Sequence, residues 1–129
     1  MSIHAKISIF DTYIHVDYFG EYKNESANDS IDEVVKLCKS KNYTKVLFDF
    51  RRITGDVSTF ERFKMAEHLI SSKPSNIRFA CIATEQQTLP VKIGEIFAKA
   101  AGVDIKITED EGNAYKWLDI QPNEIKKLE

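Results

Sequence analysis

Two short, nearly continuous apolar segments constrain the fold of this chain more than any other feature of its sequence. They are Val-Leu-Phe at residues 46–48 and Ile-Arg-Phe-Ala-Cys-Ile-Ala at residues 77–83. Strands with apolar side chains on both faces are typical of a parallel sheet that helices cover on both sides. Parallel neighbours also need a long crossover connection, usually a helix. The two segments therefore predict an α/β layer structure with these strands at its centre.

Alternation of apolar and polar residues marks the other expected strands. Residues 3–10 and 13–19 alternate on either side of the short polar connection Asp11-Thr12, which predicts an antiparallel hairpin. Residues 103–107 alternate in the same way and predict the last strand. Between the strands, apolar residues recur at intervals of three and four, as they do on the buried face of a helix.

Four helices follow from that spacing. Ser30 with Glu33, and Ser58 with Glu61, have the form of a capping box at a helix start. Pro90 suits the start of the third helix, where its missing N–H does no harm. We expect each helix to bury one stripe: Ile31, Val34, Val35 and Cys38; Phe60, Phe63, Ala66, Leu69 and Ile70; Ile93, Ile96, Phe97, Ala100 and Ala101; and Ala114, Trp117 and Leu118.

The resulting order is β-β-α-β-α-β-α-β-α, and crossover connections of this kind are right-handed almost without exception. It predicts an α/β fold in which a mixed sheet, with an N-terminal antiparallel hairpin followed by parallel strands, has helices packed on it. Residues 1–120 are expected to form a single domain, and residues 121–129 a polar tail.

Composition excludes several classes of protein. The 129 residues include 18 Lys and Arg against 20 Asp and Glu, for a formal net charge of −2, which argues against a nucleic-acid partner. The sequence has neither the apolar block of a signal peptide nor a membrane-spanning stretch, so we expect a cytoplasmic protein. Cys38 and Cys81 are expected to be buried free thiols. No residue spacing indicates a metal site or a cofactor.

Candidate binding residues follow the first buried strand. Ligands of open α/β sheets bind outside the carboxyl ends of the parallel strands, and residues 49–58 are expected there. Asp49 ends a buried strand, where a carboxylate needs a hydrogen-bond donor, and Arg51 or Arg52 can supply one. These three residues and Asp56 form either a structural ion pair that organises the loop or a site that contacts a ligand or partner.

Two other segments are expected at the same edge of the sheet. Residues 84–88 form a polar loop in which Thr84 and Gln86 are candidate ligand contacts, and residues 108–111 follow the last strand. The sequence shows neither a nucleophile with its base nor a pair of acid–base residues, so we expect no catalytic residues and no enzyme activity.

Several segments carry a resemblance to a known family. VLFDFR at residues 46–51 precedes a loop with Gly55, and FERF at residues 60–63 opens a helix. IRFACIA at residues 77–83 and EDEGNAYKWL at residues 109–118 follow in the same order. Together with residues 97–107 they resemble the SpoIIAA-like family of STAS-like proteins, named for an anti-sigma-factor antagonist. This family shares its fold with the CRAL-TRIO lipid-transfer domains.

The resemblance implies a non-enzymatic regulatory module that acts through a protein partner or a small ligand. In the antagonists a Ser or Thr after the corresponding strand is phosphorylated, and the positions nearest to it here are Ser58 and Thr59. The alternative function is a protein that binds a small molecule or lipid headgroup with the loops at the carboxyl ends of the strands. Aromatic residues of the hairpin predict core packing, an exposed edge for self-association as a homodimer or for partner docking, or a hydrophobic ligand pocket beneath them: Tyr13, Tyr18, Phe19 and Tyr22.

Overall fold

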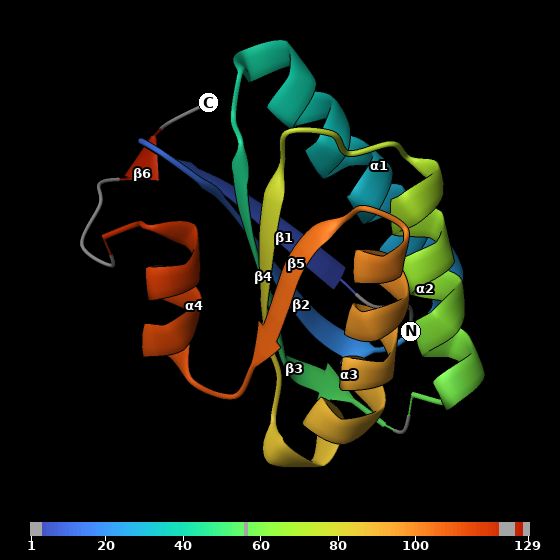
Figure 1. The fold of residues 1–129 in the computed structure, drawn as a ribbon. Helices are drawn as coiled ribbons and strands as arrows, with labels where there is room; N and C mark the ends of the chain where they lie inside the picture. The colour runs from blue at the N-terminus through green and yellow to red at the C-terminus, as the bar shows by residue number, and fades with distance from the viewer. Residues whose placement is uncertain (1–3, 56, 122–125, 128–129) are drawn as a thin grey trace.

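A sheet of six strands lies at the centre of the computed structural model, which describes residues 4–55, 57–121 and 126–127 (Figure 1). The strands are ordered β5-β4-β3-β2-β1-β6 across the sheet. Their bounds are β1 (His4–Phe10), β2 (Ile14–Glu21), β3 (Lys45–Thr54), β4 (Arg78–Ile82), β5 (Asp104–Thr108) and β6 (Lys126–Lys127). The helices are α1 (Asn24–Lys41), α2 (Thr59–Ser71), α3 (Glu85–Ala100) and α4 (Glu111–Leu118).

The directions of the strands confirm the predicted mixed sheet. β1 and β2 pair antiparallel, whereas β2, β3, β4 and β5 pair with one another in parallel. The predicted order of strands and helices is confirmed as well. One further strand, β6, pairs antiparallel with the end of β1, where Lys127 is opposite Ile9. It lies within residues 121–129, which were expected to be a polar tail. Its two residues are both lysines, so the sequence shows no alternation of apolar and polar residues that would predict a strand there.

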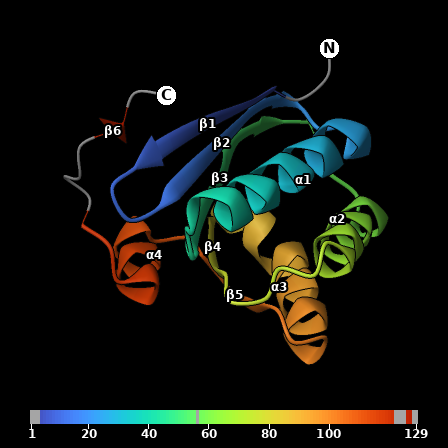
Figure 2. The same cartoon turned by 90° about the horizontal axis from the view of Figure 1, so that it is seen from above.

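The helices cover the two faces of the sheet unequally. In the described chain α1, α2 and α3 lie on one face and α4 on the other (Figure 2). Phe48 and Phe79 face the three helices, and their rings stack with 5.6 Å between centroids. Leu47 and Ala80 belong to a second core, together with Leu118 of α4. Because side chains of β3 and β4 are buried in both cores, the prediction of two central strands covered on both faces is confirmed.

The start of α1 differs from the sequence prediction. The helix begins at Asn24, and Ser30 lies buried inside it instead of capping it. The Ser30 hydroxyl donates to the carbonyl oxygen of Ala27 at 2.7 Å and shares a hydrogen bond of 2.6 Å with the Tyr18 hydroxyl. A serine inside a helix is accommodated when its hydroxyl bonds a carbonyl of the preceding turn. The capping-box pattern at Ser30 was therefore misleading.

The other predicted helix starts had different outcomes. At α2 the capping box is present, because the Glu61 amide donates to Ser58 Oγ at 3.1 Å and the Ser58 amide donates to Glu61 Oε1 at 3.0 Å. α3 begins at Glu85 and not at Pro90, which lies in its second turn. Glu and Gln residues with good helix propensity precede the proline, and they extend the helix toward the N-terminus.

The buried hydrogen bond between Ser30 and Tyr18 yields a test of this packing. We expect Ser30→Ala to lower the free energy of unfolding by about 1–3 kcal/mol, because it leaves the Tyr18 hydroxyl buried without this partner. Ser40→Ala is the matched control, since Ser40 makes the same kind of bond to the preceding turn of α1 but is exposed; its effect should stay within about 0.5 kcal/mol. Urea denaturation measures both. Equal effects of the two substitutions would contradict this account.

Candidate functional site

Asp49 lies on the face of the sheet that α4 covers, and its position differs from the prediction. β3 does not end near Asp49 but continues to Thr54, so Asp49 lies inside a strand. Its carboxylate is buried and accepts three hydrogen bonds from Arg51. The Arg51 amide and Nε each lie 3.0 Å from Oδ1, and Nη2 lies 2.8 Å from Oδ2. The predicted need for a donor is thus met by a residue two positions along the same strand.

These hydrogen bonds determine the ionisation of Asp49. Burial by itself raises the pKa of the carboxyl group, but the hydrogen bonds and the positive charge of Arg51 outweigh it. The pKa of Asp49 is therefore held below its ordinary value of 3.8. Both carboxylate oxygens are engaged by one guanidinium, a strong bidentate arrangement.

Arg51 also connects β3 to α4. Its Nη2 donates to Glu111 Oε2 at 3.2 Å, and Glu111 is the first residue of α4. The helix is capped by Asp110, whose side chain accepts from the amide of Gly112 at 2.9 Å. The predicted structural ion pair is therefore present, and it also orients the N-terminus of a helix 60 residues farther along the chain.

Arg52 has a different partner. Its guanidinium pairs with Asp17 of β2, next to a shift in register between β2 and β3. Near this pair, two buried atoms have no hydrogen-bond partner among the described residues: His15 Nε2 and Asp17 Oδ1. Burial lowers the pKa of His15 below 6.5, although the carboxylates of Asp17 and Asp49 oppose the shift. The neutral imidazole is thus favoured beneath the Asp49–Arg51 pair.

The remaining predicted residues do not gather into one site. Thr84 is half-buried between β4 and α3, whereas Gln86 lies in the first turn of α3 and not in a polar loop. This corrects the predicted loop at residues 84–88, because α3 begins at Glu85. Ser58 is exposed at the N-cap of α2. Thr59 begins the same helix, with a side chain that the structure does not describe, and Asp56 lies outside the described residues.

An exposed apolar surface was missed by the sequence analysis. Phe60 and Phe63 of α2 are 69% and 36% exposed, and Ile96 and Phe97 of α3 are 69% and 41% exposed. The prediction that these four side chains are buried is wrong, whereas Ala66 and Leu69 of the predicted α2 stripe do face the cavity beneath the helix. On α2, Arg62 and Met65 line that cavity, and Phe60 and Phe63 do not. We call the surface formed by Phe60, Phe63, Ile96 and Phe97 the outer aromatic face.

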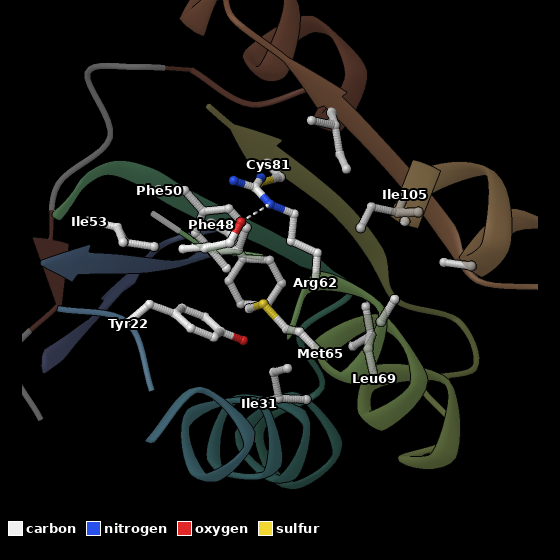
Figure 3. Close-up of a pocket in the computed structure, with 15 residues that line it drawn as sticks. Tyr22, Ile31, Phe48, Phe50, Ile53, Arg62, Met65, Leu69, Cys81 and Ile105 are labelled. Atoms are coloured by element: carbon white, nitrogen blue, oxygen red, sulfur yellow. Dashed lines mark hydrogen bonds between the residues drawn. The ribbon is translucent and has the colours of Figure 1, made fainter. Parts of the chain in front are cut away.

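A cavity of about 80 Å³ lies under the inner side of α2, between this helix, α3 and the sheet (Figure 3). The residues that line it are Tyr22, Ile31, Phe48, Phe50, Ile53, Val57, Arg62, Met65, Ala66, Leu69, Cys81, Gly94, Ala98, Ile105 and Ile107. A hydrophobic pocket beneath the hairpin aromatics was one of the predicted alternatives, and Tyr22 of that cluster lines this cavity; its other lining residues were not predicted. Two signals were available: an arginine among the apolar positions of α2, and Gly94 in the middle of α3.

The aromatic residues of the hairpin pack mostly in the interior. Tyr13, Tyr18 and Tyr22 are buried, whereas Phe19 is 39% exposed. Core packing, one of the three predicted roles, is therefore observed for the three tyrosines. The homodimer through the hairpin stays a prediction.

The described residues form neither a metal site nor a membrane-spanning helix. No group of three or more His, Cys, Asp or Glu side chains there is placed to hold a metal ion. Among the helices described, none combines the length and the apolar character that crossing a membrane requires. Cys38 and Cys81 are buried free thiols, as predicted. Burial raises the pKa of both thiols, so neither has the character of a reactive cysteine.

Comparison with known proteins places this fold in a class. No protein-family model and no curated protein matches the chain. Among solved structures it is similar to an uncharacterized protein from the DUF3478 family with a SpoIIAA-like fold, from Shewanella loihica PV-4. The TM-score is 0.59 at 19% sequence identity, and the match covers 91% of this chain and 94% of the other. The chain therefore has the SpoIIAA-like fold that the sequence resemblance predicted.

The Asp49–Arg51 pair predicts a specific response to acid. Because the folded-state pKa of Asp49 is lowered, its contribution to stability is fully present above pH 3.8 and is lost as the pH falls through the lowered value. We expect Asp49→Asn to reduce the free energy of unfolding at pH 7 by roughly 1–2 kcal/mol, allowing for the exposed part of Arg51. The same variant should lose less stability than the wild type between about pH 5 and pH 2.

Urea denaturation at several pH values measures this difference. Asp104→Asn is a suitable control, because Asp104 forms an ion pair with Arg78 in which both side chains are about half exposed. Its effect at pH 7 should stay within about 0.5 kcal/mol. Parallel stability curves for the wild type and Asp49→Asn would show that the pair does not ionise as described.

Proposed function

We propose that this protein is a non-enzymatic binding module that docks a partner protein on the outer aromatic face of α2 and α3. The observation that carries the proposal is the exposure of four large apolar side chains on two adjoining helices, while most other large apolar side chains are buried. A contiguous apolar surface on a folded domain commonly marks a site of protein interaction. The SpoIIAA-like fold supports this assignment, since the family is named for a protein that acts on another protein.

The geometry of the face suits an interaction hot spot. The rings of Phe63 and Phe97 pack edge to face with 5.6 Å between centroids, so each limits the motion of the other. The ammonium group of Lys64 lies over the ring of Phe60, 5.5 Å from its centroid. Aromatic side chains held in place before binding lose little conformational entropy when a partner covers them, and such residues dominate many interfaces.

Ser58 lies next to this face and provides a means of regulating it. The residue is exposed and precedes Phe60 by two positions. In the capping box its hydroxyl accepts from the Glu61 amide, while the Glu61 carboxylate accepts from the Ser58 amide. A phosphate on Ser58 would meet the Glu61 carboxylate at close range, so phosphorylation would open the capping box beside the docking face.

The alternative function, a ligand gripped by the loops at the carboxyl ends of the strands, has less support. Both oxygens of the Asp49 carboxylate are engaged by Arg51, and Arg52 pairs with Asp17. These groups act on each other and hold β2, β3 and α4 together. The same pairing supports the non-enzymatic part of the proposal, because it leaves Asp49 poorly suited to acid–base chemistry.

The docking proposal predicts a loss of binding that is confined to one face. The double variant Phe63→Asp/Phe97→Asp should weaken binding of the partner by about 30-fold or more, as expected for central aromatic anchors. The partner is first identified in extracts of the source cells as a protein retained by the wild type and not by this variant. It is then purified, and its affinity is measured by isothermal titration calorimetry.

Phe19→Asp is the matched control, because Phe19 is similarly exposed but lies on β2. This variant should bind the purified partner as the wild type does, and circular dichroism should show that all variants are folded. If no purified protein distinguishes the double variant from the control, the proposal is wrong. It is also wrong if the wild type sediments as a dimer that the double variant dissociates, because a second copy would then cover the face.

A further inference from the structure

A groove lies at the end of the sheet where the parallel strands begin, away from the outer aromatic face. The loops that lead into β3, β4 and β5 come together at this end (Figure 1). Two adjoining hollows of about 510 and 250 Å³ lie among these loops and share Thr44, Ser75 and Asn76 in their lining. We call the two together the amino-end groove, and we propose that it binds a short acidic segment of a protein, an interaction that goes beyond the docking function.

Basic side chains gather around the amino-end groove. Five basic residues line it or adjoin a lining residue in the chain: Lys39, Lys41, Lys45, Lys73 and Arg78. By the same criterion the acidic residues are two, Asp104 and Asp119. The whole chain has a formal net charge of −2, so its charges are distributed unevenly and one end of the molecule is basic. Such a surface attracts an acidic partner and orients it as it approaches.

Three of these cations have no partner of their own. Lys39, Lys41 and Lys73 are exposed, and none of their ammonium groups takes part in an ion pair or hydrogen bond in the part of the chain that the structure describes. A carboxylate of a partner would therefore not have to displace an existing ion pair in order to reach them.

The two acidic residues are involved in contacts that give the groove its shape. Arg78 Nε donates to the Asp104 carboxylate at 3.0 Å, which connects the first residues of β4 and β5. Lys45 Nζ donates to the carbonyl oxygen of Asp119 at 2.8 Å, which connects the start of β3 to the end of α4. The floor of the groove is thus fixed before a partner binds, which lowers the entropy lost on binding.

Stabilisation of the helices explains only part of this basic charge. Lys39 and Lys41 lie in the last turn of α1, where a cation is favourable in its own right. Lys45 and Arg78, in contrast, are the first residues of β3 and β4, so no helix end requires their charge.

Lys73 occupies a position that is typical of glycine. It follows the last turn of α2 with φ at 52°, in the left-handed region, and its amide donates to the carbonyl oxygen of Ile70 at 3.1 Å. Glycine adopts this conformation without strain and is the commonest residue at such a helix end. The lysine therefore lies where the local backbone disfavours it, which is consistent with a use for its charge outside folding.

The shape of the groove favours an extended peptide over a small molecule. Thr44, Ser75 and Asn76 are exposed, so the groove is open to the solvent and polar along its length. Sites for small molecules are mostly apolar and enclose most of the ligand.

The surroundings of the groove favour an acidic peptide over a nucleic acid. Proteins that bind single-stranded nucleic acids stack the bases on exposed aromatic rings. At this end the ring of Trp117 is covered by the guanidinium of Arg78, 4.5 Å from its centroid, so it offers no free face there. The remainder of the chain carries an excess of acidic residues, which would repel a long polyanion but not a short one.

Trp117 is a reporter of binding at this groove. It is the only tryptophan of the chain, and Arg78, which covers its ring, also lines the groove. Octaglutamate should therefore change the tryptophan fluorescence saturably, and isothermal titration calorimetry measures its affinity. Octalysine, which has the opposite charge, should not bind. Raising the salt concentration from about 0.05 M to about 0.5 M should weaken octaglutamate binding severalfold, because exposed charges are then screened.

Two double variants that remove the same charge from different places test the site. Lys39→Gln/Lys73→Gln should weaken octaglutamate binding by about fivefold or more, since two exposed charge pairs are lost. Lys6→Gln/Lys23→Gln is the matched control, because Lys6 on β1 and Lys23 before α1 are exposed lysines that do not line the groove. This control should bind as the wild type does.

Lys73→Gly separates binding from stability. It should weaken octaglutamate binding by about twofold, while the midpoint of urea unfolding should rise, because glycine relieves the left-handed conformation. A loss of binding in this variant therefore does not arise from unfolding.

The proposal is overturned if octaglutamate does not bind, if octalysine binds equally well, or if the two double variants bind octaglutamate alike. It is also overturned if an oligothymidylate of the same length binds more tightly than octaglutamate, because the occupant would then be a nucleic acid. None of these outcomes affects the docking proposal, since Phe63 and Phe97 are left unchanged in every variant.

Discussion

The burial of β3 on both of its faces is the constraint on which the rest of this structure depends. β3 lies between β2 and β4 and is parallel to both, so each connection must cross over the sheet through a helix. Phe48 requires cover on one side of the strand and Leu47 on the other. The three helices that cover the first face and the single helix on the second meet these requirements. The Asp49–Arg51 pair and the cavity both lie where a helix meets this strand.

The helices cover the two faces of the sheet in different ways. On the α4 side, the short helix leaves room for charged groups, and the Asp49–Arg51 pair reaches Glu111 to hold the helix N-terminus against the sheet. On the other side, α2 and α3 lie over large aromatic side chains, and packing between them and the sheet is incomplete. The charged cluster therefore serves mainly to hold the fold together, while the outer aromatic face that we propose as a docking site lies on α2 and α3.

α2 separates the cavity from the outer aromatic face. Its inner side carries Arg62 and Met65 into the cavity, and its outer side presents Phe60 and Phe63 to the solvent. Apolar residues occur on both sides of this helix, which is why the predicted stripe joined the exposed Phe60 and Phe63 to Ala66 and Leu69 on the inner side. A helix with one apolar side would have been placed correctly by sequence, but it could not serve both as cover for the sheet and as an exposed contact surface.

The sequence by itself determined what depends on neighbouring residues. Strand runs, the order of the elements and the capping box at Ser58 were predictable, because each is encoded within a few positions of the chain. The need of Asp49 for a donor was also predictable, since Arg51 lies two positions away on the same strand. Tertiary structure alone decided the pairing of Arg52 with Asp17, the burial of Ser30 against Tyr18, the rotation of α2 and the cavity beneath it. Those features depend on contacts between segments that are distant in the sequence. Such contacts form only when the whole chain packs, so no short stretch of sequence predicts them.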